Sequence, residues 1–131
     1  MTLLKELSLK YPKTAYQFFK EGKLNEIEGN VDKALTHYKK AVKLNPQYLI
    51  YIINLIKNNT KLLNQNKEYY AKCLKKYGDL LKDKEKFDTA LSWYKKAAKQ
   101  NPLYTRVIIE FMEEFPDFLH QNKSFYTNQL K

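Results

Sequence analysis

The stretch Ala34-Leu-Thr-His-Tyr-Lys-Lys-Ala-Val-Lys-Leu-Asn-Pro-Gln-Tyr48 decides the fold, because it recurs 56 residues later as Ala90-Leu-Ser-Trp-Tyr-Lys-Lys-Ala-Ala-Lys-Gln-Asn-Pro-Leu-Tyr104. When residues 14–70 are aligned without gaps to residues 70–126, 22 of the 57 positions are identical. A fixed period of this size is typical of proteins built from stacked repeats. The chain therefore contains a duplicated unit of 56 residues.

The quoted stretch has the spacing of a helix that ends where a second helix starts. Its apolar residues, among them Ala34, Leu35, Tyr38 and Ala41, follow helical periodicity. The Asn-Pro pair that follows suits a helix start, with asparagine as the cap and proline in the first turn. The whole chain has only 3 glycines and 4 prolines, which argues against many short strands. The sequence therefore predicts an all-α fold.

Outward from this stretch, the pattern predicts three helices and one short helical turn in each unit. In the first unit, Gly29 suits a left-handed helix end, and Asn30 or Asp32 suits the next cap. In the second unit, Pro116 is expected to end or kink the third helix. The predicted elements are Lys13–Glu28, Val31–Leu44, Pro46–Asn58 and Lys61–Asn64, then Glu68–Lys84, Phe87–Gln100, Pro102–Glu114 and Asp117–Gln121.

The length of 131 residues suits a single domain. We divide it into an N-terminal cap helix at 1–10, repeat units at 11–66 and 67–122, and a tail at 123–131. The tail aligns with the start of a first helix, so it is predicted to cap the end of the stack.

These residues resemble the tetratricopeptide repeat, in which small side chains stand where two helices touch and a proline follows. The matching positions in the first unit are Gly22, Ala34, Tyr38, Ala41 and Pro46, and in the second unit Gly78, Ala90, Tyr94, Ala97 and Pro102. The resemblance implies antiparallel helical hairpins in a right-handed superhelix, here with an extra helix after each hairpin. It also implies that the first helices line a concave groove.

Few residues suggest catalysis. His37 is replaced by Trp93 in the second unit, which indicates a packing or surface role, and Cys73 is the only cysteine. We expect no enzyme activity, no cofactor and no metal site. The remaining carboxylates are expected to lie on solvated faces; they are Glu26, Glu28, Glu113, Glu114 and Asp117.

The candidate binding surface is the groove face of the two first helices. Helical spacing places one aromatic set and one lysine-rich set on this face, so the groove is expected to become basic in the second unit. The candidate residues are Tyr16, Phe19, Lys23, Lys72, Lys75, Lys76, Asp79 and Lys82. An alternative is that Tyr16 and Phe19 pack against Leu3, Leu4 and Leu7, with the lysines serving only solubility.

The net charge of +10 indicates an acidic partner. Almost all of the 24 basic residues are lysine, and Arg106 is the only arginine, which is also what AT-rich codon usage would give. The sequence favours a non-enzymatic adaptor that binds a protein or peptide segment, with RNA or DNA phosphates as the alternative partner. A homo-oligomer, covering apolar residues such as Val107, Ile108, Phe111 and Met112, stays open. No signal peptide or spanning segment is visible, so a cytoplasmic location is expected.

Overall fold

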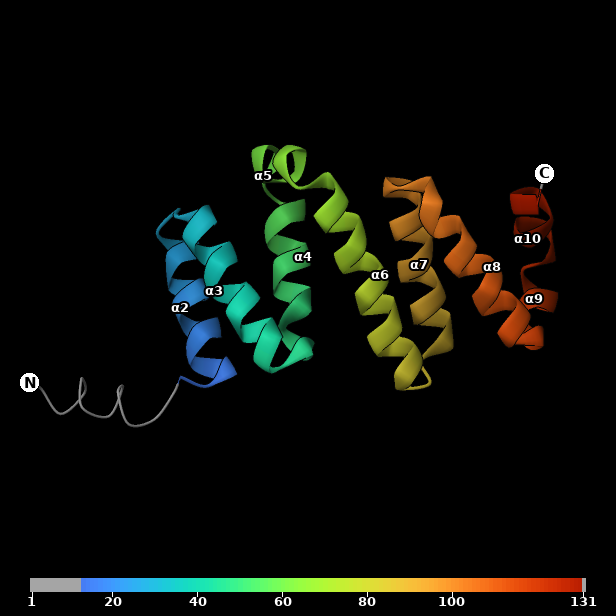
Figure 1. The fold of residues 1–131 in the computed structure, drawn as a ribbon, viewed down its shortest axis with the longest axis horizontal. Coiled ribbons are helices and arrows are strands. Elements are labelled where there is room, and N and C mark those ends of the chain that lie inside the picture. The colour runs from blue at the N-terminus through green and yellow to red at the C-terminus, as the bar shows by residue number, and fades with distance from the viewer. Residues whose placement is uncertain (1–12, 131) are drawn as a thin grey trace, which may run out of the picture. The chain divides into compact units, whose positions relative to one another are not determined.

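The computed structural model describes residues 13–130, apart from the side chains of residues 125, 126, 129 and 130 (Figure 1). Every regular element in this range is helical. The cap helix predicted at 1–10 lies outside the described residues, as do Leu3, Leu4 and Leu7. The chain divides into two compact units, Met1–Leu62 and Leu63–Lys131, which we call unit 1 and unit 2.

Unit 1 is built on an antiparallel hairpin of α2 (Ala15–Ile27) and α3 (Val31–Leu44). A 3₁₀ turn, η1 (Pro46–Tyr48), then leads into α4 (Leu49–Lys57), which packs against α3. The boundary between the units falls inside the short helix α5 (Thr60–Gln65).

Unit 2 repeats this order with α6 (Lys67–Asp83), α7 (Phe87–Gln100), η2 (Pro102–Tyr104) and α8 (Thr105–Glu114). It ends with α9 (Pro116–Gln121) and α10 (Lys123–Leu130), and both of these contact α8 or each other. The predicted all-α hairpin repeats with an extra helix after each hairpin are therefore confirmed. The superhelical arrangement of the units stays a prediction.

Local capping explains where the helices begin. The predictions for α3 and α7 are confirmed at both ends, and Gly29 adopts the expected left-handed backbone with φ of 83°. The first helix begins later than predicted because Thr14 caps it. The Thr14 hydroxyl accepts from the Gln17 amide at 3.2 Å, while the Gln17 side chain accepts from the Thr14 amide at 2.7 Å.

The third helix of each unit was predicted as one continuous helix from the proline, but it opens with a 3₁₀ turn. Asn45 caps this turn, accepting from the Gln47 amide at 3.1 Å, and Asn101 accepts from the Leu103 amide at 3.1 Å. Asn30 stands at the N-cap of α3 as predicted, but its side chain makes no capping hydrogen bond.

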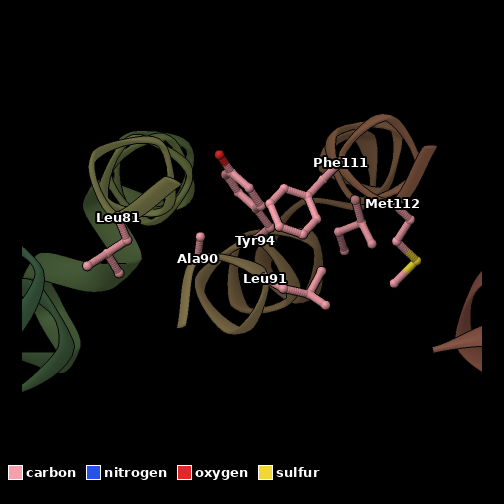
Figure 2. Close-up of a cluster of buried hydrophobic side chains, with 7 residues drawn as sticks. Leu81, Ala90, Leu91, Tyr94, Phe111 and Met112 are labelled. Atoms are coloured by element: carbon pink, nitrogen blue, oxygen red, sulfur yellow. The ribbon is translucent and has the colours of Figure 1, made fainter. Parts of the chain in front are cut away.

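The core of unit 2 lies between α6, α7 and α8 (Figure 2). Ala90 is fully buried where α6 and α7 approach, and Phe111 and Met112 fill the space between α7 and α8. Ile108, Phe111 and Met112 are at most 2% exposed within this unit. They are therefore not the open apolar end from which a homo-oligomer was argued, and that argument is wrong.

Candidate functional site

A tyrosine from the second helix fixes the hairpin of unit 1. The ring of Tyr38 lies over Gly22, where an added Cβ would come within 2.5 Å of Tyr38 Cδ1. The Tyr38 hydroxyl donates a hydrogen bond of 2.6 Å to Glu26 Oε1. Burial first, and then this bond, raise the pKa of Tyr38 above its usual range. Glu26 was expected on a solvated face; its side chain is 38% exposed, and it also serves as the acceptor for Tyr38.

Unit 2 keeps the tyrosine but takes the acceptor from another position. Tyr94 lies over Gly78, and its hydroxyl donates to Asp79 Oδ1 at 2.6 Å. Burial and the Asp79 carboxylate raise the pKa of Tyr94 as well. In the repeat alignment, Asp79 matches Lys23, and Lys82 matches Glu26. Lysine and carboxylate have therefore exchanged places between the units, while each tyrosine retains a charged acceptor.

The inner surface of unit 1 is an aromatic cluster formed by α2, η1 and α4. Phe19 lies at its centre, with ring centroids 5.1 Å from Tyr48 and 4.5 Å from Tyr51. Tyr16 stacks on Phe19 at 6.2 Å and remains 57% exposed. The sequence had placed Tyr16 and Phe19 together but had missed Tyr48 and Tyr51. The recurrence of Tyr48 as Tyr104 in the second repeat is the sequence signal that could have identified Tyr48.

Two lysines border the aromatic cluster. Lys20 Nζ lies 5.5 Å from the ring centroid of Tyr16, and Lys23 Nζ lies 5.6 Å from that of Tyr51. Lys23 Nζ is also 4.0 Å from Glu26 Oε1. Lysines in this position are held over the rings by cation–π attraction while their charge stays in water. The surface thus offers aromatic area next to positive charge.

The inner surface of unit 2 is a pocket of about 160 Å³ between α6, α7 and α8, here called the inner pocket. It brings together three of the predicted site residues, Lys75, Asp79 and Lys82. Lys75 pairs with Asp79 at 2.7 Å, and Lys82 pairs with Glu114 at 2.8 Å. With Glu110 also in the wall, three carboxylates face two lysines. The inner pocket therefore has no excess of positive charge.

Lys72 and Lys76 are exposed on α6 and do not line the inner pocket. Sequence reasoning missed the carboxylates of Glu110 and Glu114, which reach the pocket from α8. Glu114 is exposed, as expected for a solvated face, and its carboxylate also pairs with Lys82 at the rim of the pocket.

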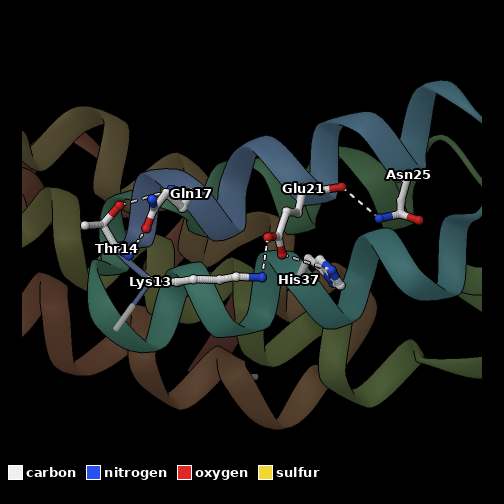
Figure 3. A network of polar contacts seen from close by, with 6 residues as sticks. All are labelled: Lys13, Thr14, Gln17, Glu21, Asn25 and His37. Atoms are coloured by element: carbon white, nitrogen blue, oxygen red, sulfur yellow. Dashed lines mark hydrogen bonds and ion pairs between the residues drawn. The ribbon is translucent and has the colours of Figure 1, made fainter. Parts of the chain in front are cut away.

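In unit 1, His37 of α3 belongs to a network of polar contacts with residues of α2 and the segment just before it (Figure 3). Glu21 Oε1 pairs with Lys13 Nζ, and Glu21 Oε2 lies 3.2 Å from His37 Nε2. His37 is half-buried against the hairpin, in agreement with its predicted packing role. Within residues 13–130, no group of three or more His, Cys, Asp or Glu side chains could hold a metal ion.

The model of a family described as Iml2/Tetratricopeptide repeat protein 39 matches residues 1–129. The search of curated proteins gave no match. None of the helices in the described part of the chain has the length and apolar character that a membrane crossing requires.

Proposed function

Because the chain belongs to the Iml2/Tetratricopeptide repeat protein 39 family, we propose that it is a non-enzymatic adaptor that binds a segment of a partner protein. Proteins of the tetratricopeptide type are generally scaffolds without catalytic activity. The observation that carries the proposal is the exposed Tyr16 ring, stacked on Phe19 at the edge of the aromatic cluster of unit 1.

Aromatic rings of this kind are favoured at protein interfaces. They bury a large area at a small cost in side-chain entropy, and tyrosine adds a polar hydroxyl. The ring of Tyr16 is supported by Phe19 and by Lys20, so little of its freedom remains to be lost on binding. The partner segment that fits this surface has an apolar side chain to cover Tyr16 and a carboxylate nearby to meet Lys20 or Lys23.

The inner pocket of unit 2 is a weaker candidate for the acidic segment that the sequence suggested. Its lysines, Lys75 and Lys82, already pair with Asp79 and Glu114. An incoming carboxylate would have to displace one of these partners and would meet Glu110 as well. Lys72 and Lys76 add positive charge only outside the pocket.

The test is the affinity of a captured partner for two variants, each of which truncates one exposed large side chain. The partner is identified by affinity capture with the full chain, purified, and titrated against Tyr16→Ala and Leu103→Ala. Leu103 is 83% exposed on η2 of unit 2 and is not part of the aromatic cluster. We expect Tyr16→Ala to raise Kd at least about tenfold, equivalent to about 1.4 kcal/mol, and Leu103→Ala to change it little. Equal losses, or full binding by Tyr16→Ala, would contradict the proposal.

A further inference from the structure

A second pocket lies on the other side of the hairpin of unit 2. It has a volume of about 420 Å³ and runs along the outer side of α7 to Asn122, between α9 and α10. We call it the outer pocket. Lys95 Nζ reaches Asn122 Oδ1 at 3.4 Å, and Lys96 Nζ lies 4.2 Å from the ring centroid of Trp93. Its polar wall residues are Asp88, Ser92, Lys95, Lys96, Lys99 and Asn122.

The two pockets differ in how far their lining residues are retained between the two repeats. Each polar wall residue of the outer pocket has the same or a very similar residue 56 positions earlier: Asp32, Thr36, Lys39, Lys40, Lys43 and Asn66. Among the residues that line the inner pocket, only Tyr94 is retained in this way. The two repeats have therefore diverged on the inner side but kept the same polar residues on the outer side.

The fold accounts for only part of this retention. Asp88 lies in the first turn of α7 and Lys99 in its last turn, where the helix dipole favours their charges. Asn122 donates to the Phe118 carbonyl at 2.9 Å. A helix end needs only one cation, however, and Lys96 and Ser92 are exposed. Retention of a whole lysine triplet points to something that the triplet binds.

We propose that the outer pocket binds an extended acidic segment of a partner protein. The described residues of the wall include three lysines and one carboxylate, Asp88, so the net charge of the wall favours anions. Lys95 and Lys99 are four residues apart, which is about 6 Å along the axis of an α-helix. Alternate residues of an extended peptide are separated by about 6.6 Å. Acidic side chains at alternate positions therefore match the spacing of the lysines.

A protein segment fits this pocket better than a single-stranded nucleic acid. Binding of single strands combines a basic groove with aromatic rings on which bases stack. Among the residues of the wall whose side chains the structure describes there is no aromatic ring, and the Trp93 ring is covered by Lys96 and packs edge-on against Tyr77. The outer pocket uses no residue of the aromatic cluster, so it goes beyond the binding proposed for unit 1.

The test uses a fluorescent peptide of alternating glutamate and serine, titrated by anisotropy against the full chain. We expect the triple variant Lys95→Glu, Lys96→Glu, Lys99→Glu to raise Kd about tenfold or more, because each exposed pair adds little alone but the three act together. The neutral triple variant with glutamine should show a smaller loss. The control variant Lys61→Glu, Lys72→Glu, Lys76→Glu changes the net charge equally at exposed positions and should retain most of the affinity.

Further measurements determine where the peptide binds and whether the pocket prefers a peptide or a nucleic acid. Addition of the peptide should shift the nuclear magnetic resonance signals of the Ser92 amide and the Asn122 side chain. Tyr16→Ala should leave the affinity for the peptide unchanged, so that failure here and failure at the aromatic cluster are distinguishable. The proposal is overturned if the control variant loses as much affinity as the outer triple variant. Tighter binding of a thymidine oligonucleotide than of the peptide would also overturn it.

Discussion

A Cβ atom on Gly78 would come within 2.6 Å of Cε1 of Tyr94, which is closer than side-chain atoms normally approach. The same relation joins Gly22 and Tyr38 in unit 1, at 2.5 Å. Because glycine has no side chain at this position of the first helix, the tyrosine ring of the second helix can pack directly against it. That ring in turn supports the inner surface in both units.

Replacement of this glycine tests the packing. Gly78→Ala forces the buried Tyr94 ring to move, and overpacking of this kind costs about 1–3 kcal/mol. The helix propensity of alanine offsets about 1 kcal/mol of that cost. We expect a net loss of up to about 2 kcal/mol in the free energy of unfolding, measured by urea denaturation. A double-mutant cycle with Tyr94→Leu should show strong coupling, and additive effects would mean that the close contact is not the cause.

A second prediction concerns the turn between the hairpin helices. Gly29 adopts φ of 83°, and its counterpart in the alignment, Glu85, adopts φ of 60° with an exposed side chain. A residue other than glycine is strained there. We expect Glu85→Gly to stabilise unit 2 by about 0.5–1 kcal/mol, and Gly29→Ala to destabilise unit 1 by a similar amount. The midpoint of urea denaturation should rise for Glu85→Gly and fall for Gly29→Ala. A midpoint lowered by Glu85→Gly would contradict this account of the turn.

The tyrosines predict how stability depends on pH. Unfolded tyrosine has a pKa of 10.0, and the pKa values of Tyr38 and Tyr94 are raised above it in the folded chain. Their contribution is fully present below pH 10 and is lost as the pH rises toward the folded pKa, at about 1.4 kcal/mol per pH unit for each tyrosine. Tyr94→Phe should therefore lose less stability than the wild type between pH 10 and pH 11. Equally steep losses in Tyr94→Phe and in the wild type over this range would contradict the role given to the Tyr94 hydroxyl.

The small residues of the second helices give a fourth prediction. Ala34 and Ala90 are fully buried where the two helices of a hairpin meet. Ala34→Leu or Ala90→Leu should cost about 1–3 kcal/mol, because the helices must separate to accept the larger side chain. Thermal melts of the two variants measure this, and unchanged melting of both would refute the assigned hairpin register.

The sequence predicted the helices well because their limits depend on local residues. Asn45 and Pro46 end α3 and start the next turn through contacts within a few positions of the chain. The repeat alignment carried the same limits to unit 2. Gly22 and Tyr38 were both assigned to the hairpin because their spacing resembles a known repeat, and the direct contact between them is seen only in the structure.

The charges of the site could not be predicted in this way. Lysines counted along α6 suggested a basic groove, but Asp79 and Glu114 pair with two of them from the same helix and from α8. The replacement of Lys23 and Glu26 by Asp79 and Lys82 is visible in the sequence. Only the structure shows that this exchange leaves a carboxylate to accept from each tyrosine hydroxyl.

The most direct test of the proposed adaptor function is photo-cross-linking from the aromatic cluster. The cross-linking residue benzoylphenylalanine is placed at position 16 in one sample and at position 103 in another, and each is irradiated with the purified partner. We predict a cross-linked complex from position 16, beside Phe19, and none from position 103. A cross-link that forms from position 103 and not from position 16 would contradict binding at the inner surface of unit 1.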